Sequence, residues 1–338
     1  MNKKVEPNTQ DLIGESELFL CAIENALKIA KTSSMTVLIQ GESGTGKEMI
    51  ARLIHEQSSV ASQPFVDINC GAIPENLLES ELFGYEKGAF TGAHRTKPGL
   101  FEMATGGTIF LDEISNTSIN FQVKLLKIVE NKKNRRIGGL KEVDVSTRVI
   151  TASNVNLLDA VKSGQFREDL YYRLNVYKIE IPPLRKRGED VILLTNYFIN
   201  YFNNEYGRQI KGINAGAESL IRKYPWPGNV RQLKNAVERA VLVESKDWIE
   251  PSDLFLDLSR SYTTHTTTVT GQVQRDNRRI EIPTEGVSFE NLEREIIMSS
   301  LKKANGNLSK AARLLQINRG KFRYRMEKLG IKSEDIEE

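Results

Sequence analysis

A glycine-rich run that ends in lysine is the first feature of this sequence with recognisable chemistry. The run consists of Gly41, Glu42, Ser43, Gly44, Thr45, Gly46 and Lys47. It follows an apolar segment at residues 37–39 and leads into a helical pattern of Ile50, Leu53 and Ile54. In a P-loop, backbone N–H groups and a helix N-terminus surround the phosphates of a nucleotide, while the lysine binds the β- and γ-phosphates. The strand, loop and helix therefore predict a nucleotide site.

The residue after this lysine departs from the common motif. A Ser or Thr that binds Mg²⁺ usually stands there, whereas this chain has Glu48. We count Glu48 among the expected nucleotide-binding residues. Thr45 or water can take the place of the missing hydroxyl as a magnesium ligand.

Two carboxylates, Asp112 and Glu113, follow an apolar strand pattern at residues 108–111. An ionised carboxylate is costly to bury unless it meets a metal ion or another partner. We expect Asp112 to hold Mg²⁺ through water and Glu113 to orient the water that attacks the γ-phosphate. The alternative is an acidic helix N-cap after a strand, which the nearby P-loop makes the weaker interpretation. ATP and Mg²⁺ are the cofactors that these residues predict.

The elements that must position these residues form an alternating pattern. Short β-branched runs cover residues 35–40, 64–69, 108–112, 148–153 and 177–181. Amphipathic stretches lie between them, such as the one that carries Phe121, Leu125, Leu126 and Val129. Alternation of this kind predicts an α/β fold with a parallel sheet, which ends at Pro182.

Composition divides the chain further. The expected parts are a short tail at residues 1–10, the α/β part at 11–183, a helical lid subdomain at 184–258, a linker at 259–286 and a helical domain at 287–338. The linker is rich in Ser, Thr and charged residues and poor in apolar ones. Such a segment cannot bury enough apolar surface to order itself, so we expect it to be flexible.

The bulk composition excludes several classes of protein. The net charge of +3 is mild, so affinity for nucleic acid must come from local clusters of charge. Cys21 and Cys70 are two cysteines in a chain without secretory features, which favours reduced thiols. No apolar run reaches the roughly 18 residues of a membrane span, and the N-terminus lacks the apolar stretch of a signal peptide. We expect a soluble cytoplasmic protein.

The last two predicted helices, at residues 308–315 and 319–329, carry a cluster of positive charge. Asn307 is expected to cap the first of them. The second has an inner stripe of Phe322, Met326 and Leu329 and the outward candidates Arg319, Gly320, Lys321, Arg323 and Tyr324. This pattern predicts a helix-turn-helix that binds double-stranded DNA, although a basic helical hairpin can also be a solvated surface.

A second glycine-flanked loop follows a helical pattern at residues 74–83. It consists of Gly88, Ala89, Phe90, Thr91, Gly92 and Ala93. Glycine weakens a helix interior by about 1 kcal/mol relative to alanine, so the run predicts a mobile tip rather than a core helix. From the residues alone, an ordinary surface turn and a partner-contact loop are equally open.

This loop and its surroundings resemble the AAA+ activators of the sigma-54 form of bacterial RNA polymerase. The resemblance extends from about Leu12 to Ile331, and the C-terminal domain resembles the Fis-type domain of the same activators. It implies that Phe90 and Thr91 contact sigma-54, that the protein forms a hexameric ring, and that residues 289–303 dimerise the DNA-binding domain. A Glu at the position of Glu48 is normal in this family.

The resemblance also implies roles for single residues. Asn69 matches the family residue that pairs with the catalytic glutamate. Asn154 matches the residue called the first sensor, and Arg231 matches the second sensor. Arg167 and Arg173 match arginine fingers, which act on the active site of a neighbouring subunit. Asn69 and Asn154 can equally be strand-end caps, and either arginine can form an ion pair with the acids beside it. Departures from the family pattern are Ser153, Gln232 and Gln316.

The expected function is that of a transcription activator which binds enhancer-like DNA and uses ATP hydrolysis to convert closed promoter complexes of sigma-54 polymerase into open ones. One rival is a DNA-binding regulator without ATPase activity, and another is an AAA+ enzyme that remodels other clients. Because only about ten residues precede the α/β part, we expect control by a separate protein, such as a negative regulator that acts in trans. Asn229 is expected to cap the helix that carries Arg231.

Overall fold

The computed structural model describes residues 12–32, 35–243, 247–256, 289–304, 307–315, 319–329 and 331. The chain divides into two compact units, Met1–His265 and Thr266–Glu338, each of which is described here by itself. The predicted tail at residues 1–10 and the predicted linker at 259–286 lie outside the described residues.

A five-stranded sheet in the order β2-β5-β8-β1-β9 forms the centre of the first unit. The strands are β1 (Val37–Gln40), β2 (Phe65–Asn69), β5 (Thr108–Asp112), β8 (Arg148–Ser153) and β9 (Tyr177–Glu180). All neighbouring strands are parallel, which confirms the predicted sheet. Asn69 lies opposite Asp112 and Gln40 lies opposite Ser153. The carboxyl ends of the strands therefore bring the P-loop, Asp112 and Asn154 to one edge of the sheet.

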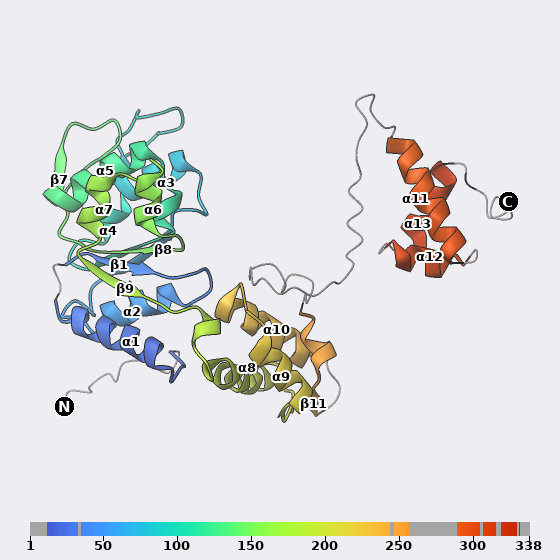
Figure 1. Ribbon diagram of the computed structural model, residues 1–338. Coiled ribbons are helices and arrows are strands. Elements are labelled where there is room, and N and C mark those ends of the chain that lie inside the picture. Colours follow the sequence, from blue (N-terminus) through green and yellow to red (C-terminus); the bar gives the residue numbers. More distant parts are fainter. Residues whose placement is uncertain are drawn as a thin grey trace. The chain divides into compact units, whose positions relative to one another are not determined.

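Helices cover both faces of this sheet (Figure 1). Helices α1 (Glu17–Ala30) and α2 (Lys47–Glu56) lie on one face, and α3 (Glu75–Phe83), α4 (Leu100–Met103), α5 (Ile119–Asn131), α6 (Leu157–Lys162) and α7 (Glu168–Leu174) lie on the other. Side chains of a strand alternate between the two faces. Phe110 accordingly belongs to the apolar cluster under α1 and α2, whereas Ile109 and Leu111 belong to the cluster under α3 to α7.

Two short antiparallel hairpins extend from the α/β part, and the sequence pattern did not reveal either of them. One pairs β3 (Gly84–Tyr85) with β4 (Lys97–Pro98), and the other pairs β6 (Lys133–Arg135) with β7 (Glu142–Asp144). Strands of two or three residues are too short to show an alternating apolar pattern. The hairpins touch each other, because Ile137 forms a bridge with Tyr85.

The lid subdomain is built from α8 (Asp190–Tyr206), α9 (Ala215–Lys223) and α10 (Asn229–Val243). Short strands β10 (Gly212–Ile213) and β11 (Trp248–Ile249) pair in parallel beside them. Trp226 is 1% exposed, and its Nε1 donates to the carbonyl oxygen of Ile221 at 2.9 Å. This side chain fixes the turn between α9 and α10 to the apolar core of the lid.

The second unit contains α11 (Phe289–Lys303), α12 (Leu308–Leu314) and α13 (Arg319–Lys328). Asn307 caps α12, because its Oδ1 accepts from the backbone N–H groups of Ser309 and Lys310 at 3.1 Å each. Phe322, Met326 and Leu329 are buried as predicted. On α11, Leu301 is buried in this domain, whereas Ile296 is 43% exposed. Within the described residues, every helix is too short or too polar to cross a lipid bilayer.

Candidate functional site

The P-loop lies between β1 and α2, as the sequence predicts. Gly44 and Gly46 have φ values of 76° and 98°, which glycine adopts without steric cost. Lys47 Nζ donates to the carbonyl oxygens of Gly41 at 2.9 Å and Glu42 at 3.2 Å, and these bonds hold the ammonium inside the loop. Thr45 is buried, and its Oγ1 donates to the carbonyl oxygen of Glu42 at 2.8 Å.

A cavity of about 600 Å³ opens beside this loop and gathers residues from several parts of the sequence. The predicted residues among its lining are Ser43, Gly44, Thr45, Gly46, Lys47, Glu48, Asn69, Asp112, Glu113 and Arg231. Apolar side chains complete the wall, among them Ile13 and Phe19 near the N-terminus and Leu194 in the lid. The lining of the cavity therefore combines phosphate-binding groups with apolar side chains.

Charges of both signs meet at the phosphate side of the cavity. Lys47 is 7% exposed, and burial lowers the pKa of its ammonium group. The nearby carboxylates of Asp112 and Glu113 act in the opposite direction and favour the protonated form. A cation enclosed beside two carboxylates is a suitable environment for a phosphate chain with a bound divalent cation.

Glu113 is held by a residue that the sequence analysis did not single out. Its Oε2 accepts from Asn116 Nδ2 at 3.1 Å, and its backbone has φ 53°. Asn69 Oδ1 instead accepts from the N–H groups of Gly71 at 2.8 Å and Ala72 at 3.0 Å. In this structure the amide oxygen of Asn69 thus caps the end of β2, and Asn116 is the amide bonded to the Glu113 carboxylate.

Asn154 follows β8 at the same edge of the sheet. Its Oδ1 is buried and has no hydrogen-bond partner in the described part of the chain. Ser153 bonds locally, since its Oγ donates to the carbonyl oxygen of Val155 at 2.7 Å. A buried amide oxygen without a partner is costly, so an acceptor at this position fits a site in which water or a ligand completes the bonding.

Three of the predicted nucleotide-binding residues are not part of the cavity lining. Gly41 and Glu42 are absent from its lining. The Glu42 carboxylate accepts from Arg185 Nη1 at 2.7 Å, and this guanidinium holds the pKa of Glu42 below its usual value. Asn154 is also outside the lining. Glu48 lies at the edge, where its carboxylate accepts from Arg52 Nε at 3.0 Å.

The start of α10 is bonded to the P-loop through Asn229. This residue is fully buried, has φ 50°, and its Nδ2 donates to the carbonyl oxygen of Ser43 at 3.0 Å. Its Oδ1 accepts from the N–H of Leu184 at 2.8 Å, and the N–H of Val230 donates to the carbonyl oxygen of Gly44 at 3.0 Å. We call these bonds the P-loop–lid clasp. The prediction that Asn229 caps its own helix was wrong, because its side chain bonds to other segments.

The candidate arginine fingers lie outside the cavity. Arg167 precedes α7 and forms an exposed ion pair with Asp169, at 2.6 Å from Nη2 to Oδ2. Arg173 lies in the last turn of α7 and is exposed. Neither residue lines the cavity of its own chain, so a role at an active site would call for a second subunit.

The loop from Gly88 to Ala93 projects from the β3–β4 hairpin. Its ends are joined by a hydrogen bond from the N–H of Gly88 to the carbonyl oxygen of Ala93 at 2.9 Å. Phe90 is 46% exposed and packs edge-on against Tyr85 with ring centroids 5.0 Å apart. Gly88 and Gly92 have positive φ, and Thr91 and Gly92 are exposed. The tip therefore presents an aromatic ring and a hydroxyl to solvent.

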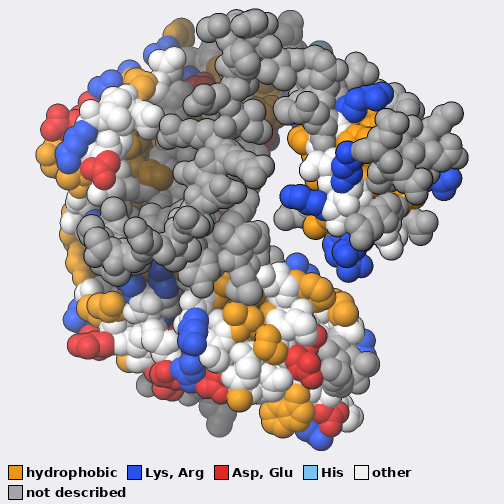
Figure 2. Space-filling view, turned by 45° about the vertical axis from the view of Figure 1, so that its right-hand side comes forward, with side chains coloured by type: hydrophobic (Ala, Val, Ile, Leu, Met, Phe, Trp, Pro, Cys, Tyr) orange, Lys and Arg blue, Asp and Glu red, His pale blue; other side chains and the backbone are white. Residues whose placement is uncertain are grey.

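The candidate DNA-contacting residues lie on α13. Arg323 and Tyr324 are exposed, as predicted. The side chains of Arg319 and Lys321, and the surroundings of Gly320, lie outside the described residues. Figure 2 shows several Lys and Arg side chains on the visible face of the C-terminal helices. Positive charge on such a face suits contacts with DNA phosphates.

Three family models match consecutive parts of the chain. A sigma-54 interaction domain matches residues 12–180, and an AAA+ ATPase lid domain matches residues 185–270. A bacterial regulatory protein model of the Fis family matches residues 288–329. The order of the matches is the order of the α/β part, the lid and the C-terminal helices.

Curated relatives share this organisation over most of the chain. The chain is 43% identical over 321 residues to the nitrogen fixation protein AnfA of Azotobacter vinelandii, a match that covers 95% of the chain and 58% of AnfA. It is 43% identical over 325 residues to the regulatory protein AtoC of Escherichia coli K12, covering 96% of the chain and 69% of AtoC. The chain thus spans only part of the length of these relatives.

Solved structures agree with these matches. NtrX from Brucella abortus in complex with ATP has a TM-score of 0.68 and 30% identity, covering 95% of this chain and 70% of NtrX. The complex of NtrX with ADP has a TM-score of 0.71 and 29% identity, covering 95% and 69%. These matches show that the chain belongs to the family of sigma-54-dependent transcription activators, with an AAA+ domain and a Fis-type helix-turn-helix.

Proposed function

We propose that this chain binds ATP with Mg²⁺, hydrolyses it in a hexameric ring, and uses the free energy to open promoter complexes of sigma-54 polymerase. One observation carries the proposal: Lys47, the adjacent pair Asp112 and Glu113, and Arg231 come from three separate segments and line a single cavity of about 600 Å³. A binding protein without hydrolysis needs the lysine and a magnesium ligand such as Asp112, but it has no use for a second carboxylate, such as Glu113, that positions water.

The cavity fits the two ends of a nucleotide. Backbone N–H groups of Gly44 and Gly46 and the ammonium of Lys47 would hold the phosphates. Ile13, Phe19 and Leu194 would pack against the adenine base, since aromatic rings bury well against apolar side chains. When bound, ATP and Mg²⁺ supply the phosphoanhydride bond to be broken and the cation that screens its charge. Asp112 would hold the cation through water, and the Thr45 hydroxyl, which donates its hydrogen to the carbonyl oxygen of Glu42, keeps lone pairs with which it or a water in its place could also serve as a ligand.

Hydrolysis needs a positioned water and a stabilised γ-phosphoryl group. Glu113 would accept a hydrogen bond from the attacking water, and Asn154, at the same edge of the sheet, would act as the first sensor that the family resemblance implies. Arg231, at the start of α10, would contact the nucleotide. Because the P-loop–lid clasp bonds the same helix to Gly44, the presence or loss of the nucleotide would change the orientation of the lid. Replacing Glu113 by Gln should reduce hydrolysis by about 10²–10⁴-fold, the usual range for a lost general base.

Arg167 or Arg173 would complete the site of a neighbouring subunit, as the family resemblance implies. An arginine finger is worth about 10³–10⁵ in rate where it has been measured. A mixing experiment tests this role. Arg167→Ala and Glu113→Gln proteins should each be inactive alone, and mixing them should restore hydrolysis if intact sites form between unlike subunits. No recovery with either Arg167 or Arg173 variants would overturn the shared site and the ring mechanism.

Phe90 and Thr91 would contact sigma-54, and the exposed residues of α13 would bind enhancer-like DNA as a dimer. Control would come from a partner acting in trans, such as a negative regulator that binds the AAA+ part. Adding candidate partner proteins while the ATP hydrolysis rate is measured tests this point. If no protein of the host changes that rate, control by a partner in trans is wrong.

Promoter opening tests the whole proposal against its rivals. ATP hydrolysis without opening would indicate an AAA+ enzyme with other clients. DNA binding with neither hydrolysis nor opening would indicate a regulator that works without ATP.

A further inference from the structure

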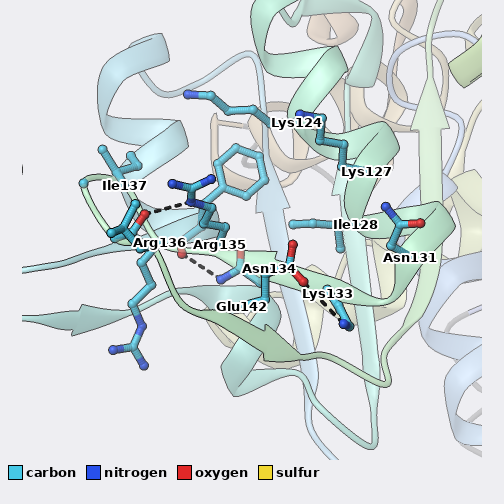
Figure 3. A pocket seen from close by; sticks show the side chains of 14 residues that line it. Lys124, Lys127, Ile128, Asn131, Lys133, Asn134, Arg135, Arg136, Ile137 and Glu142 are labelled. Atoms are coloured by element: carbon cyan, nitrogen blue, oxygen red, sulfur yellow. Dashed lines mark hydrogen bonds and ion pairs between the residues drawn. The ribbon is translucent and has the colours of Figure 1, made fainter.

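Ion pairs in this chain differ in how far water reaches them. A second cavity, of about 530 Å³, lies between α5 and the β6–β7 hairpin, and the Lys133–Glu142 pair lines it (Figure 3). Both side chains of that pair are about half exposed, and an exposed pair does little to hold two segments together. Arg187, which lines the nucleotide cavity, and Asp190 are instead 2% exposed each, with 2.8 Å from Nε to Oδ2. A pair buried this deeply needs further bonds to compensate for its lost hydration.

Those further bonds go to the segment that precedes α1. Asp190 Oδ1 accepts from the backbone N–H groups of Glu15 at 2.7 Å and Ser16 at 3.0 Å, and its Oδ2 accepts from Ser16 Oγ at 2.9 Å. Arg187 Nη2 donates to the carbonyl oxygen of Ile13 at 2.8 Å. Helix α8 of the lid begins at Asp190, so these bonds join the segment to the start of the lid. We call this set of bonds the Arg187–Asp190 anchor.

Gly14 shows how closely the segment approaches the buried pair. A Cβ at this position would lie 2.4 Å from Arg187 Nη2 and 2.7 Å from Asp190 Oδ2. Only a residue without a Cβ lets the backbone come this near. The Arg187 guanidinium also lies over the ring of Phe19, at 3.6 Å from the ring centroid. The same cation therefore holds both a backbone carbonyl and an aromatic ring of the N-terminal segment.

Asp190 binds these partners in its ionised form. Burial alone would raise the pKa of its carboxyl group, but the bonds from the Glu15 N–H, Arg187 and Ser16 outweigh burial and hold the pKa below its usual value. Both oxygens act as acceptors, Oδ1 for two backbone N–H groups and Oδ2 for Arg187 Nε–H and the Ser16 hydroxyl. An asparagine at this position would place an NH₂ group against an N–H donor whichever way its amide is turned.

The anchor joins residues that line the nucleotide cavity to residues that do not. Ile13, Phe19 and Arg187 are part of the lining, whereas Ser16 and Asp190 are not. In the proposed function, Ile13 and Phe19 pack against the base. Ser16 and Asp190 can therefore act on a nucleotide only through the residues that they hold in place.

We propose that Asp190 and Ser16 are positioning residues for the nucleotide base, because through Arg187 they fix the wall of Ile13 and Phe19 to the start of the lid. The base then binds to a preformed surface and loses less free energy to the ordering of that wall. The inference rests on the proposed function, in which this wall receives the adenine. The P-loop–lid clasp bonds instead to the loop that would hold the phosphates, so the anchor and the clasp should act on different parts of the nucleotide.

The test compares ADP with inorganic tripolyphosphate, a ligand that has phosphates but no base, with Mg²⁺ present and titration calorimetry as the measurement. Asp190→Asn should weaken ADP binding by about tenfold or more, the fold-change that corresponds to one lost hydrogen bond to a charged group. It should leave the affinity for tripolyphosphate unchanged. Ser16→Ala, which removes one bond to Asp190, should weaken ADP binding by about threefold. Asn229→Ala, which breaks the clasp, should weaken both ligands.

Glu189→Gln is the matched control. It neutralises the neighbouring carboxylate, which is exposed and pairs with Arg222, and it should leave both affinities unchanged. Steady-state ATP hydrolysis gives a second measurement. Asp190→Asn and Ser16→Ala should raise KM with little change in kcat, because the phosphates and Glu113 stay in place.

The outcomes separate this inference from the proposed function. If the parent protein does not bind ADP, the proposed function fails. If the parent binds ADP, and Asp190→Asn and Ser16→Ala bind it as tightly as Glu189→Gln, the positioning role is wrong while the proposed function stands. An equal loss of affinity for ADP and tripolyphosphate, or a fall in kcat at unchanged KM, would show that the anchor only stabilises the lid and would also overturn the inference. Ser16→Ala removes a single hydroxyl and decides the matter if Asp190→Asn does not fold.

Discussion

Asn229 Nδ2, at the start of the lid helix α10, donates a hydrogen bond to the carbonyl oxygen of Ser43 in the P-loop at 3.0 Å. The N–H of Val230 donates to the carbonyl oxygen of Gly44 beside it. The lid is thereby bonded to the backbone that would surround the phosphates. A change in the P-loop conformation on nucleotide binding or release therefore acts directly on the orientation of α10.

Removal of the Asn229 side chain should loosen this coupling. Asn229→Ala leaves the buried N–H of Leu184 and the carbonyl of Ser43 without partners, at a cost of about 1–3 kcal/mol per group. We expect faster release of a fluorescent ADP analogue and a higher KM for ATP. Arg185→Gln breaks only an exposed ion pair with Glu42, worth about 0–1 kcal/mol, and is the matched comparison. Equal effects of the two variants on ADP release would contradict a specific role for the clasp.

Asn116 should restrain Glu113, the residue proposed to orient the attacking water. Its Nδ2 bonds to Glu113 Oε2 at 3.1 Å and competes with water for that carboxylate. Asn116→Ala should raise the basal kcat for ATP hydrolysis by about fivefold, as expected from a hydrogen bond of about 1 kcal/mol, with little change in KM. Steady-state kinetics without sigma-54 measures both constants. A fall in kcat would show that Asn116 instead holds Glu113 in its working position.

Trp226 should be essential for the stability of the lid. Trp226→Ala removes a fully buried indole from the turn before α10 and should cost about 3–5 kcal/mol. Trp226→Phe keeps most of the apolar contact and loses the bond to the Ile221 carbonyl, so it should cost about 1–3 kcal/mol. Urea unfolding of both variants measures the difference. An effect of Trp226→Ala below that of Trp226→Phe would contradict this packing.

The two cysteines should differ sharply in reactivity. Cys21 is exposed, whereas Cys70 is buried and its burial raises the pKa of the thiol to about 12. Because the thiolate is the reactive form, a thiol reagent at pH 8 should label Cys21 rapidly in the native protein and Cys70 only after unfolding. Mass spectrometry of the labelled peptides identifies the site. Rapid native labelling of Cys70 would mean that the β2 edge of the site opens readily.

The sequence predicts the parallel sheet because each of its strands is a short run of apolar or β-branched residues. Thr108–Asp112 and Arg148–Ser153 are continuous apolar or β-branched runs with the observed bounds. The P-loop, Asp112 and Glu113 follow from motifs whose chemistry depends on local spacing. Such spacing between residues close together in the chain can be read from the sequence without knowing the fold.

Contacts between distant segments could not be predicted in the same way. The bonds from Asn229 to Ser43 and Leu184 depend on how the lid folds back on the P-loop, and an Asn after Gly reads locally as a helix cap. Asn116 lies one helical turn beyond Glu113 and resembles any polar residue in a short turn. The β6–β7 hairpin and its cavity arise from strands too short for a periodic signal.

Promoter opening is the measurement that tests the central claim most directly. Purified protein and ATP are added to a preformed closed complex of sigma-54 polymerase, and DNA opening is followed with Thr91→Ala and Glu113→Gln proteins in parallel. The account predicts opening by the parent protein and loss of opening in both variants, with hydrolysis retained by Thr91→Ala and lost in Glu113→Gln. Opening by the Glu113→Gln protein, or opening without ATP, would contradict the claim that hydrolysis drives this protein's action.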